Sequence, residues 1–295
     1  MIRYDKLIAR LHKGEKIIID GATGSEAERR GVPTLDDAWS GGGNLSHPDI
    51  VREIHEEYIR VGAEIIISNS FATTRHALRD AGIEEQFESS NRRAVELACE
   101  ARDNTQRPDV LVAGGISYWS FTGNHPDLRT LANDVALQAS IMKEAGADLL
   151  MTEMMVDIDR MSVTIDAAKS CGLPVWAGLT CEPDTNGIMC LRNGEPLVNA
   201  LAALAASDIP LVSIMHTEVK YIDACLDILE KHWNGLTGVY AHVGKYADGH
   251  WHFDFTITPK DYAEHSCGWL GRNVQIIGGC CGIMPEHIHT LSTMT

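Results

Sequence analysis

The sequence of 295 residues has no apolar run of about 18 residues, and therefore predicts no transmembrane helix. Its first residues, MIRYDKLIARLHKGEK, are mixed and charged and lack the apolar segment of a signal peptide. These two absences lead us to expect a cytoplasmic protein. The sequence also has no low-complexity segment and no segment with the composition of a linker, so we expect one domain over residues 1–295.

Positive charge is scarce, since 25 Lys and Arg face 41 Asp and Glu and the formal net charge is −16. Such a surface repels phosphate backbones and anionic lipids, so we expect neither nucleic acid nor a membrane as partner. Hydrophobic residues make up 44% of the chain and charged residues 22%, which is the balance of a globular protein. A chain of this length can bury a large core.

Cysteine, in contrast, is present eight times. A cytoplasmic compartment keeps thiols reduced, so these residues do not predict a disulfide framework. Two of them, Cys280 and Cys281, are adjacent in the stretch IIGGCCGIMPEHI, residues 276–288. Adjacent cysteines form a disulfide only through a strained ring. Clustered cysteines in this setting indicate metal binding or catalysis.

Short β-branched runs alternate with longer amphipathic stretches along the whole chain. The expected strands are 16–20, 64–71, 110–117, 149–153, 175–181, 211–217, 236–243 and 274–279, and the expected helices are 47–63, 85–102, 131–145, 158–170, 196–206, 219–231, 260–270 and one from 285. Eight strands alternating with eight helices predict a parallel (β/α)8 TIM barrel. An open doubly wound sheet is the alternative, but no GxGxxG follows the first strand.

In such a barrel the C-terminal ends of the strands converge on one face, where active sites lie. Reactive side chains occur at five of the predicted strand ends: Asp20, Glu153, Cys181, His216, and the pair Cys280 and Cys281. We therefore expect groups far apart in sequence to meet at this face.

The paired thiols suit zinc, which favours thiolate and imidazole ligands in a tetrahedral shell. Both can reach one ion if the backbone bends sharply between Cys280 and Cys281, and the flanking glycines permit such a bend. A third ligand from another strand end would leave one coordination position open, which is the pattern of a catalytic zinc. The alternative is two small buried residues beside the barrel wall.

Four stretches together resemble one family: DGATGSE after the first strand, NSF after the second, the Glu that ends the fourth, and IIGGCCGIMPEHI. The chain resembles the homocysteine S-methyltransferases over roughly Lys16 to Leu291. This family includes the betaine–homocysteine methyltransferases and the homocysteine module of cobalamin-dependent methionine synthase. The resemblance implies a zinc barrel in which the metal binds the thiol of homocysteine, and the thiolate attacks an activated methyl group to give methionine.

The resemblance also implies roles for particular residues. Cys280 and Cys281 would be zinc ligands, and Asp20, Gly21 and Glu153 would contact homocysteine. Glu153 would meet the substrate ammonium group, and backbone donors near Gly21 and Ala22 would meet its carboxylate. The structural alternatives are a turn residue at Asp20 and a rim ion pair at Glu153.

The third zinc ligand departs from the family pattern. The family shows a cysteine in an element like GVNC, whereas this chain reads VSIMHT and has His216 there. A Cys2His site is chemically sound, and with a substrate thiolate it carries a formal charge of −1 in place of −2. Cys181 is the rival third ligand. The remaining cysteines are interpreted as structural: Cys99, Cys171, Cys190, Cys225 and Cys267.

A second departure follows the seventh strand, where the chain reads YAHVGKYADGHWHF in place of the family's YPNSGE. His242 takes the position of the asparagine, and His250 and His252 follow. This loop is either a polar lid or a site for a second metal or an altered substrate.

The leading hypothesis is a zinc-dependent S-methyltransferase acting on a small-molecule thiol, with homocysteine as the default. The methyl donor would be S-methylmethionine, S-adenosylmethionine, a betaine-like amine or a methyl-corrinoid protein. Phe71, Trp119 and Trp176 are the candidates for an aromatic wall around a cationic donor, and the shortage of aromatic residues favours a sulfonium or partner-delivered methyl group. An oligomer is compatible with the sequence.

Two other functions use the same predicted barrel. A zinc hydrolase would activate water at the Cys2His site, with Glu153 or Glu218 as general base. A non-catalytic relative would bind zinc or a partner without turnover.

Overall fold

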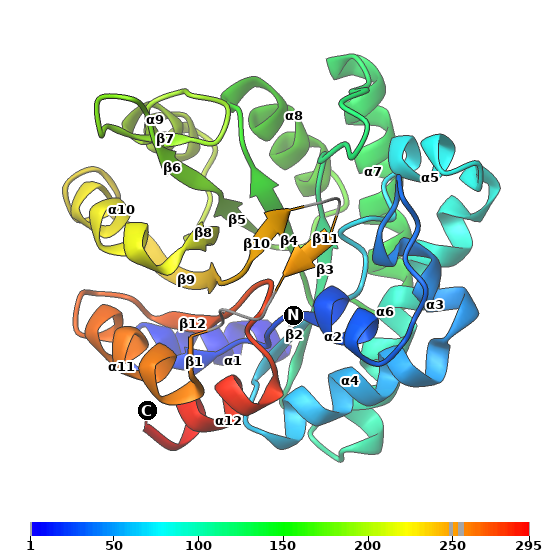
Figure 1. The fold of residues 1–295 in the computed structure, drawn as a ribbon, viewed down its shortest axis with the longest axis horizontal. Coiled ribbons are helices and arrows are strands. Elements are labelled where there is room, and N and C mark those ends of the chain that lie inside the picture. The colour runs from blue at the N-terminus through cyan, green and yellow to red at the C-terminus, as the bar shows by residue number, and fades with distance from the viewer. Residues whose placement is uncertain (1, 248–249, 253–256, 295) are drawn as a thin grey trace.

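The computed structural model describes residues 2–247, 250–252 and 257–294, and it confirms the barrel (Figure 1). Parallel strands form one sheet in the order β1 (Ile17–Ile18), β12 (Ile276–Gly279), β9 (Leu236–His242), β8 (Leu211–Glu218), β5 (Val175–Leu179), β4 (Leu149–Met155), β3 (Leu111–Ile116) and β2 (Ile65–Ile67). A parallel bridge between Ile19 and Ile65 joins the two outer strands and closes the sheet.

An outer ring of helices covers the sheet (Figure 1). Its members are α4 (Pro48–Arg60), α6 (Phe87–Asn104), α7 (Leu128–Ala145), α8 (Ile158–Lys169), α9 (Leu197–Ala206), α10 (Val219–His232), α11 (Pro259–Leu270) and α12 (Pro285–Met294). The strands are buried almost throughout, because helices pack on one face and the barrel interior on the other. This double burial explains their nearly continuous apolar sequences.

Several short elements are additions to the predicted pattern. They are α1 (Ile2–Leu11), α2 (Thr23–Arg29), α3 (Gly43–Ser46), α5 (Arg75–Asp80), the 3-10 turns η1 (Ser40–Gly42) and η2 (Glu84–Gln86), and two hairpins, β6 (Cys181–Pro183) with β7 (Met189–Leu191) and β10 (Lys245–Ala247) with β11 (His250–His252). The predicted strand 175–181 was too long, because β5 ends at Leu179 and Cys181 begins the first hairpin. No helix in the described ranges is long and apolar enough to cross a membrane.

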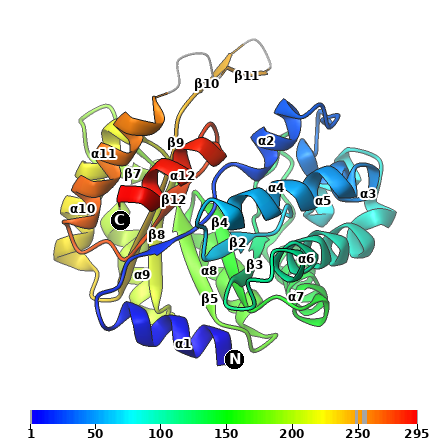
Figure 2. The same cartoon turned by 90° about the horizontal axis from the view of Figure 1, so that it is seen from below.

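Helix α1 covers the N-terminal end of the barrel, on the side opposite the β10–β11 hairpin (Figure 2). The Tyr4 hydroxyl accepts a hydrogen bond from Trp176 Nε1 at 3.0 Å, and both side chains are buried. Trp176 is the second residue of β5, so its ring belongs to this lower layer. The expectation that Trp176 contributes to a donor-binding wall is therefore wrong.

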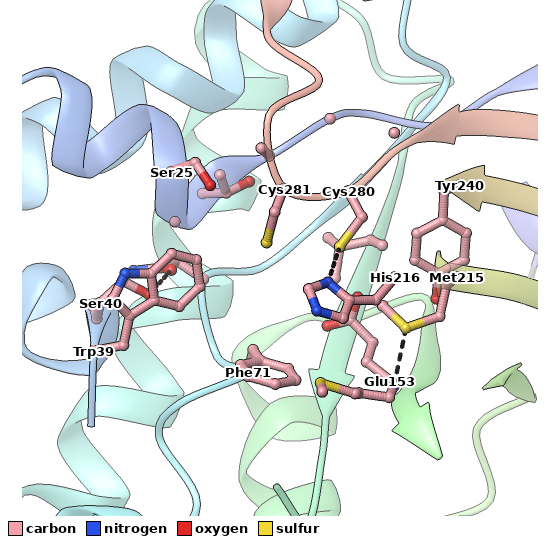
Figure 3. A pocket seen from close by; sticks show the side chains of 18 of the residues that line it. Ser25, Trp39, Ser40, Phe71, Glu153, Met215, His216, Tyr240, Cys280 and Cys281 are labelled. Atoms are coloured by element: carbon pink, nitrogen blue, oxygen red, sulfur yellow. Dashed lines mark hydrogen bonds between the residues drawn. The ribbon is translucent and has the colours of Figure 1, made fainter. Parts of the chain in front are cut away.

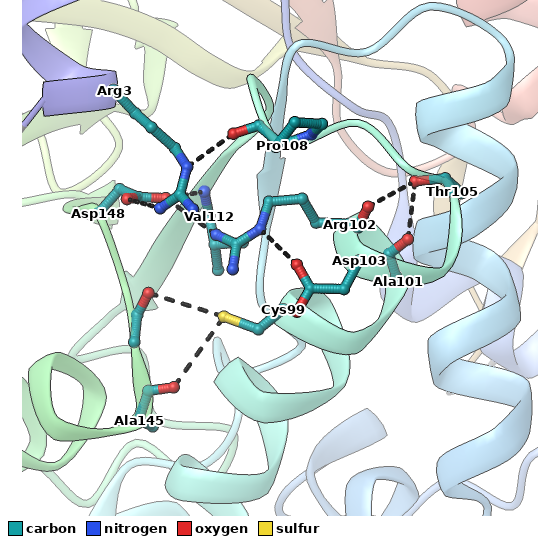
Figure 4. Close-up of polar contacts among 11 residues, drawn as sticks. Arg3, Cys99, Ala101, Arg102, Asp103, Thr105, Pro108, Val112, Ala145 and Asp148 are labelled. Carbon is teal, nitrogen blue, oxygen red and sulfur yellow. Dashed lines mark hydrogen bonds and ion pairs between the residues drawn. The ribbon is translucent and has the colours of Figure 1, made fainter.

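Asp148 anchors the same end of the barrel (Figure 4). Its carboxylate pairs with Arg3 of α1 at 3.1 Å and with Arg102 of α6 at 3.4 Å. It also accepts a hydrogen bond from the backbone N–H of Val112 at 3.0 Å. One buried carboxylate thus connects α1, α6 and β3 at the entrance to β4.

We predict that Asp148→Ala lowers the free energy of unfolding by about 3 kcal/mol, because it leaves the buried Val112 N–H without an acceptor and removes one of the two carboxylates that pair with Arg102. Urea unfolding followed by circular dichroism measures the change. Asp109→Ala is the matched control, since Asp109 pairs with Arg107 on the surface and should cost less than about 1 kcal/mol. Equal costs for the two variants would contradict the anchoring role of Asp148.

Candidate active site

A cavity of about 270 Å³ lies at the C-terminal ends of the strands. It is lined by Asp20, Gly21, Ala22, Thr23, Gly24, Ser25, Trp39, Ser40, Ile67, Ser68, Asn69, Ser70, Phe71, Trp119, Phe121, Glu153, Met154, Arg192, Met215, His216, Tyr240, Gly279, Cys280 and Cys281. The residues of the leading prediction for acceptor and zinc binding are all in this set: Asp20, Gly21, Ala22, Glu153, His216, Cys280 and Cys281. The chain has therefore brought together groups that are up to 261 positions apart, from Asp20 to Cys281.

His216, Cys280 and Cys281 form one cluster on the cavity wall, with their ligand atoms all within 4.8 Å of one another. His216 lies near the end of β8, and the two cysteines directly follow β12. Figure 3 shows the Cys280 sulfur directed at the imidazole, where Sγ and Nδ1 are 3.5 Å apart. We call these three residues the His-Cys-Cys cluster.

Local irregularities of the strands place these side chains. The register between β8 and β9 shifts between Met215 and Glu218, and His216 in this bulge has φ = 43°, a left-handed value that is costly for a non-glycine residue. After β12, a Cβ atom at Gly279 would lie 2.1 Å from Ile283 Cγ2, so only glycine permits this close turn. The chain thus uses a bulge on one strand and a tight turn after another to bring imidazole and thiols together.

The cluster suits the ligand shell of a tetrahedral zinc ion. Bond lengths of about 2.3 Å to sulfur and 2.05 Å to nitrogen place adjacent ligand atoms about 3.6 Å apart. The Sγ–Nδ1 separation of 3.5 Å agrees with this spacing. If these three side chains held a zinc ion, its fourth coordination position would face the cavity.

The two thiols differ electrostatically. A hydrogen bond from the Cys280 thiol, helped by the charge of His216, lowers the pKa of Cys281 well below its ordinary value. The same hydrogen bond and burial raise the pKa of Cys280. The cluster therefore already favours one thiolate among its three side chains.

Two buried carboxyl groups face the same cavity. Burial raises the pKa of Glu153 to about 8, with a further contribution from the charge of Cys281. Burial also raises the pKa of Asp20, although the N–H of Ile67 donates to its Oδ2 at 2.7 Å. Among the described residues, none donates a hydrogen bond to the Glu153 carboxyl group. Burial without a protein partner thus favours the neutral form of Glu153, and a bound cation would favour the ionised form.

The backbone around Glu153 is also irregular. The register between β4 and β5 shifts between Thr152 and Met155, and Met154 has φ = 57°. A Cβ atom at Gly115 would lie 2.7 Å from Glu153 Oε2, so this glycine leaves the space that the carboxyl group occupies. A bulge and a neighbouring glycine thus direct Glu153 into the cavity.

The segment after β1 presents backbone donors to the cavity. The N–H of Ala22 donates to the Ile283 carbonyl at 2.9 Å, so it is already used within the protein. The N–H groups of Thr23, Gly24 and Ser25 are in the first turn of α2, where no carbonyl of that helix can pair with them. The Ser25 hydroxyl is buried and has no hydrogen-bond partner among the described residues. This arrangement shifts the expected carboxylate contact from Ala22 to the residues that follow it.

Other candidates named from the sequence lie elsewhere. The Cys181 thiol hydrogen-bonds to Cys225 and has a raised pKa, so it is not in the His-Cys-Cys cluster. Glu218 is outside the cavity lining and pairs with Lys220 at 2.7 Å. The His242 ring lies beside that of His216, with ring centroids 4.3 Å apart and ring planes tilted by 34°.

The idea of a second metal in the histidine loop stays untested. The side chains of His250 and His252 lie outside the described residues.

The sequence reasoning missed part of the cavity wall. Trp39, Phe121 and Arg192 line it beside the predicted Phe71 and Trp119. Trp39 comes from an irregular segment and packs on Gly24, where a Cβ atom would lie 2.5 Å from its ring. Figure 3 shows Trp39 and Phe71 across the cavity from His216. No helical or strand periodicity marks Trp39, Phe121 or Arg192, because all three lie in irregular segments.

A closed barrel with its cavity at the C-terminal strand ends is the arrangement of a barrel enzyme, and the His-Cys-Cys cluster on the cavity wall could hold a metal ion. Residues 17–295 match the family model for homocysteine S-methyltransferase. The chain belongs to this family and is an enzyme of the methyltransferase class, as its resemblance predicted.

Individual relatives agree over nearly the full chain. Homocysteine S-methyltransferase of Escherichia coli is 27% identical, with 99% of each chain covered. Selenocysteine methyltransferase of Astragalus bisulcatus is 26% identical over 94% of this chain and 92% of its own. The metallated crystal structure of the Escherichia coli homocysteine methyltransferase MmuM superposes with a TM-score of 0.82 at 24% identity, covering 97% of this chain and 99% of that one, and supports the fold.

We predict that Glu153→Gln stabilises the metal-free protein at high pH. The ordinary pKa of Glu is 4.5 and that of Glu153 is about 8, so between these values the unfolded chain has lost a proton that the folded chain keeps. The free energy of unfolding therefore falls as pH rises through this window, and glutamine removes that loss.

Thermal melts at pH 5 and pH 8 measure the effect, with an expected gain in Tm of about 2–5 °C at pH 8 and a smaller change at pH 5. Glu85→Gln is the control, since Glu85 is exposed and has no ion pair among the described residues. The same pH profile in both variants would refute the buried, unpaired state of Glu153.

Proposed function

We propose that this protein transfers a methyl group to the thiol of homocysteine at a zinc site formed by His216, Cys280 and Cys281. The observation that carries the proposal is that this cluster shares one cavity with the unpartnered Glu153 carboxyl group. A thiol-binding group and an ammonium-binding group in one cavity select an amino acid that carries a thiol. Homocysteine is the default acceptor because the family model bears its name.

Zinc, when bound, would lower the pKa of a coordinated thiol and so supply a thiolate at neutral pH. His216 and the two cysteines would hold the ion and leave its fourth position toward the cavity. The thiolate sulfur forms a bond to the methyl carbon, the bond from that carbon to the donor heteroatom breaks, and the bonding pair leaves with the donor. The thiol proton is released on binding, so charge and atoms balance.

The remaining residues hold the acceptor. Glu153, with Asp20 beside it, would bind the ammonium group, since both are buried carboxyls on the cavity wall. Gly21 gives the backbone its close approach, because a Cβ atom there would lie 2.3 Å from the Ile283 carbonyl oxygen. The N–H groups after Ala22 and the Ser25 hydroxyl would receive the substrate carboxylate. Methyl transfer then depends mainly on the alignment of two bound substrates.

The imidazole of His216 would change the rate of methyl transfer and leave the type of reaction the same. A neutral ligand in place of a thiolate reduces the negative charge of the loaded site by one. The bound sulfur is then easier to deprotonate and less nucleophilic. Of the two bases considered for a hydrolase, Glu218 lies outside the cavity and is paired with Lys220, whereas Glu153 lines the cavity. The hydrolase is less well supported because the family model that matches the chain is that of a methyltransferase.

The unit proposed to act is the whole barrel, residues 1–295, with a small-molecule thiol and a methyl donor as partners. A methyl-corrinoid protein stays an alternative donor, since methionine synthase of Mycobacterium leprae is 24% identical over 98% of this chain and 25% of its own length.

We predict that Cys280→Ala, Cys281→Ala and His216→Ala each lose bound zinc, because two ligands do not hold the ion against a mild chelator. Zinc per chain is measured by mass spectrometry after gel filtration, with circular dichroism to confirm folding. Cys181→Ala is the matched control and should retain about one zinc ion, because its thiol pairs with Cys225. Unchanged zinc in both Cys280→Ala and Cys281→Ala would exclude this metal site.

We predict that homocysteine adds a sulfur-to-metal charge-transfer band to the cobalt-substituted protein, saturating at one thiol per metal. Glu153→Gln should raise the homocysteine concentration at half-saturation about tenfold, because it removes the charge that pairs with the ammonium group. 3-Mercaptopropionate, which has no ammonium group, serves as the control ligand and should bind both proteins alike. Absence of the band in the cobalt-loaded wild-type protein would overturn the proposed function.

A further inference from the structure

Arg192 is an unexplained feature of the cavity wall. It is the one Lys or Arg among the described lining residues, in a chain with a net charge of −16. No carboxylate of the described residues lies within ion-pair distance of its guanidinium group. The acceptor scheme above gives it no role.

The backbone at Arg192 is fixed by neighbouring strands. Its N–H donates to the Thr180 carbonyl at 3.0 Å, beyond the end of β5. The next residue, Asn193, donates to the Val156 carbonyl at 3.1 Å, beyond the end of β4. The β6–β7 hairpin therefore presents this side chain from a rigid base at the C-terminal face of the barrel.

Nearby carboxylates are directed elsewhere. Glu195 accepts a hydrogen bond from the Ile158 N–H at 2.8 Å, and Asp157 caps α8 and pairs with Arg160 at 3.4 Å. Arg192 instead lies over the ring of Trp119, with 5.4 Å from its Cζ to the ring centroid. A guanidinium held against an aromatic ring keeps its hydrogen-bond donors available for a planar anion.

We propose that Arg192 is a specificity-determining residue of this cavity, which binds the carboxylate of the methyl donor. A donor that carries both a methylated cationic centre and a carboxylate is called an onium carboxylate below. This inference rests on the proposed function. The apolar wall formed by Trp39, Phe71, Trp119 and Phe121 suits the cationic centre, since aromatic faces attract methylated cations. Arg192 alone would repel such a cation, so a carboxylate on the same molecule is what makes the two features compatible.

The acceptor and the donor would then bind to different charged side chains of the same cavity. Glu153 and the donors after Ala22 take the amino acid group of the acceptor, and Arg192 takes the far end of the donor. A donor without a carboxylate would leave the Arg192 charge unmatched beside a cation.

The test compares two sulfonium ions of nearly equal size, dimethylsulfoniopropionate and dimethylpropylsulfonium, which differ by a carboxylate in place of a methyl group. Calorimetry measures their binding to the zinc-loaded protein, and kinetics separate the KM for the donor from that for homocysteine. S-methylmethionine and glycine betaine form two further arms, which distinguish a sulfonium from a quaternary ammonium carboxylate.

Arg192→Ala should weaken the onium carboxylates about tenfold, a modest effect because Arg192 is exposed, and leave dimethylpropylsulfonium and the homocysteine KM unchanged. Arg192→Lys should recover part of the loss, since it restores the charge without the planar fork. Arg129→Ala is the matched control, because Arg129 is exposed, unpaired among the described residues and outside the cavity lining. It should change no affinity.

Equal weakening of both sulfonium ions in Arg192→Ala, or no weakening of either, overturns the inference. Failure of the wild-type protein to bind any onium carboxylate also overturns it, and if homocysteine still produces the cobalt charge-transfer band, the proposed function stands. Loss of that band in the wild-type protein removes the proposed function and this inference with it.

Discussion

Closure of the barrel depends on Asp20, and the same residue reaches the active site. Its N–H donates to the Ile65 carbonyl at 3.0 Å, and its carbonyl accepts from the Gly279 N–H at 3.0 Å. Its carboxyl group accepts from Ile67 at 2.7 Å. One residue thus joins the short strand β1 to both neighbours, β2 and β12. Because the cysteines directly follow Gly279, the bonds that close the barrel also fix the height of the thiols beside Asp20.

The closed barrel allows the active site to contain conformations and buried groups that are energetically unfavourable. His216 and Met154 have left-handed backbone angles within strand bulges, and Glu153 is buried without a partner. Each costs free energy of folding, and each persists because eight paired strands determine the positions around it. At the opposite end of the barrel, the buried Asp148 carboxylate is paired with Arg3 and Arg102, unlike that of Glu153. Stability and chemistry are divided between the two ends of the strands.

The residues that could be predicted from the sequence are those whose position follows from strand direction. Asp20, Glu153, His216 and the cysteine pair all fall at C-terminal strand ends, and parallel topology brings such ends together. Trp176 was assigned wrongly because it is at the start of its strand, where the opposite layer lies. The alternative prediction of Cys181 as a zinc ligand did not hold for a different reason. Cys181 follows the end of β5, and the β6–β7 hairpin determines the direction of its side chain. Arg192 and Trp39 belong to irregular insertions, which carry no periodic signal to place them.

The raised pKa values also explain how an empty and a filled site can both be stable. With no cation present, a Glu153 pKa of about 8 keeps its carboxyl group protonated at neutral pH, so no uncompensated charge is buried beside the Cys281 thiolate. An ammonium group in the cavity would favour ionisation and release that proton. The thiol of the acceptor would release another as it becomes a thiolate. Acceptor binding is then coupled to the release of one proton from Glu153 and one from the acceptor's own thiol. A substrate that lacks the ammonium group would not release the first, and one that lacks the thiol would not release the second.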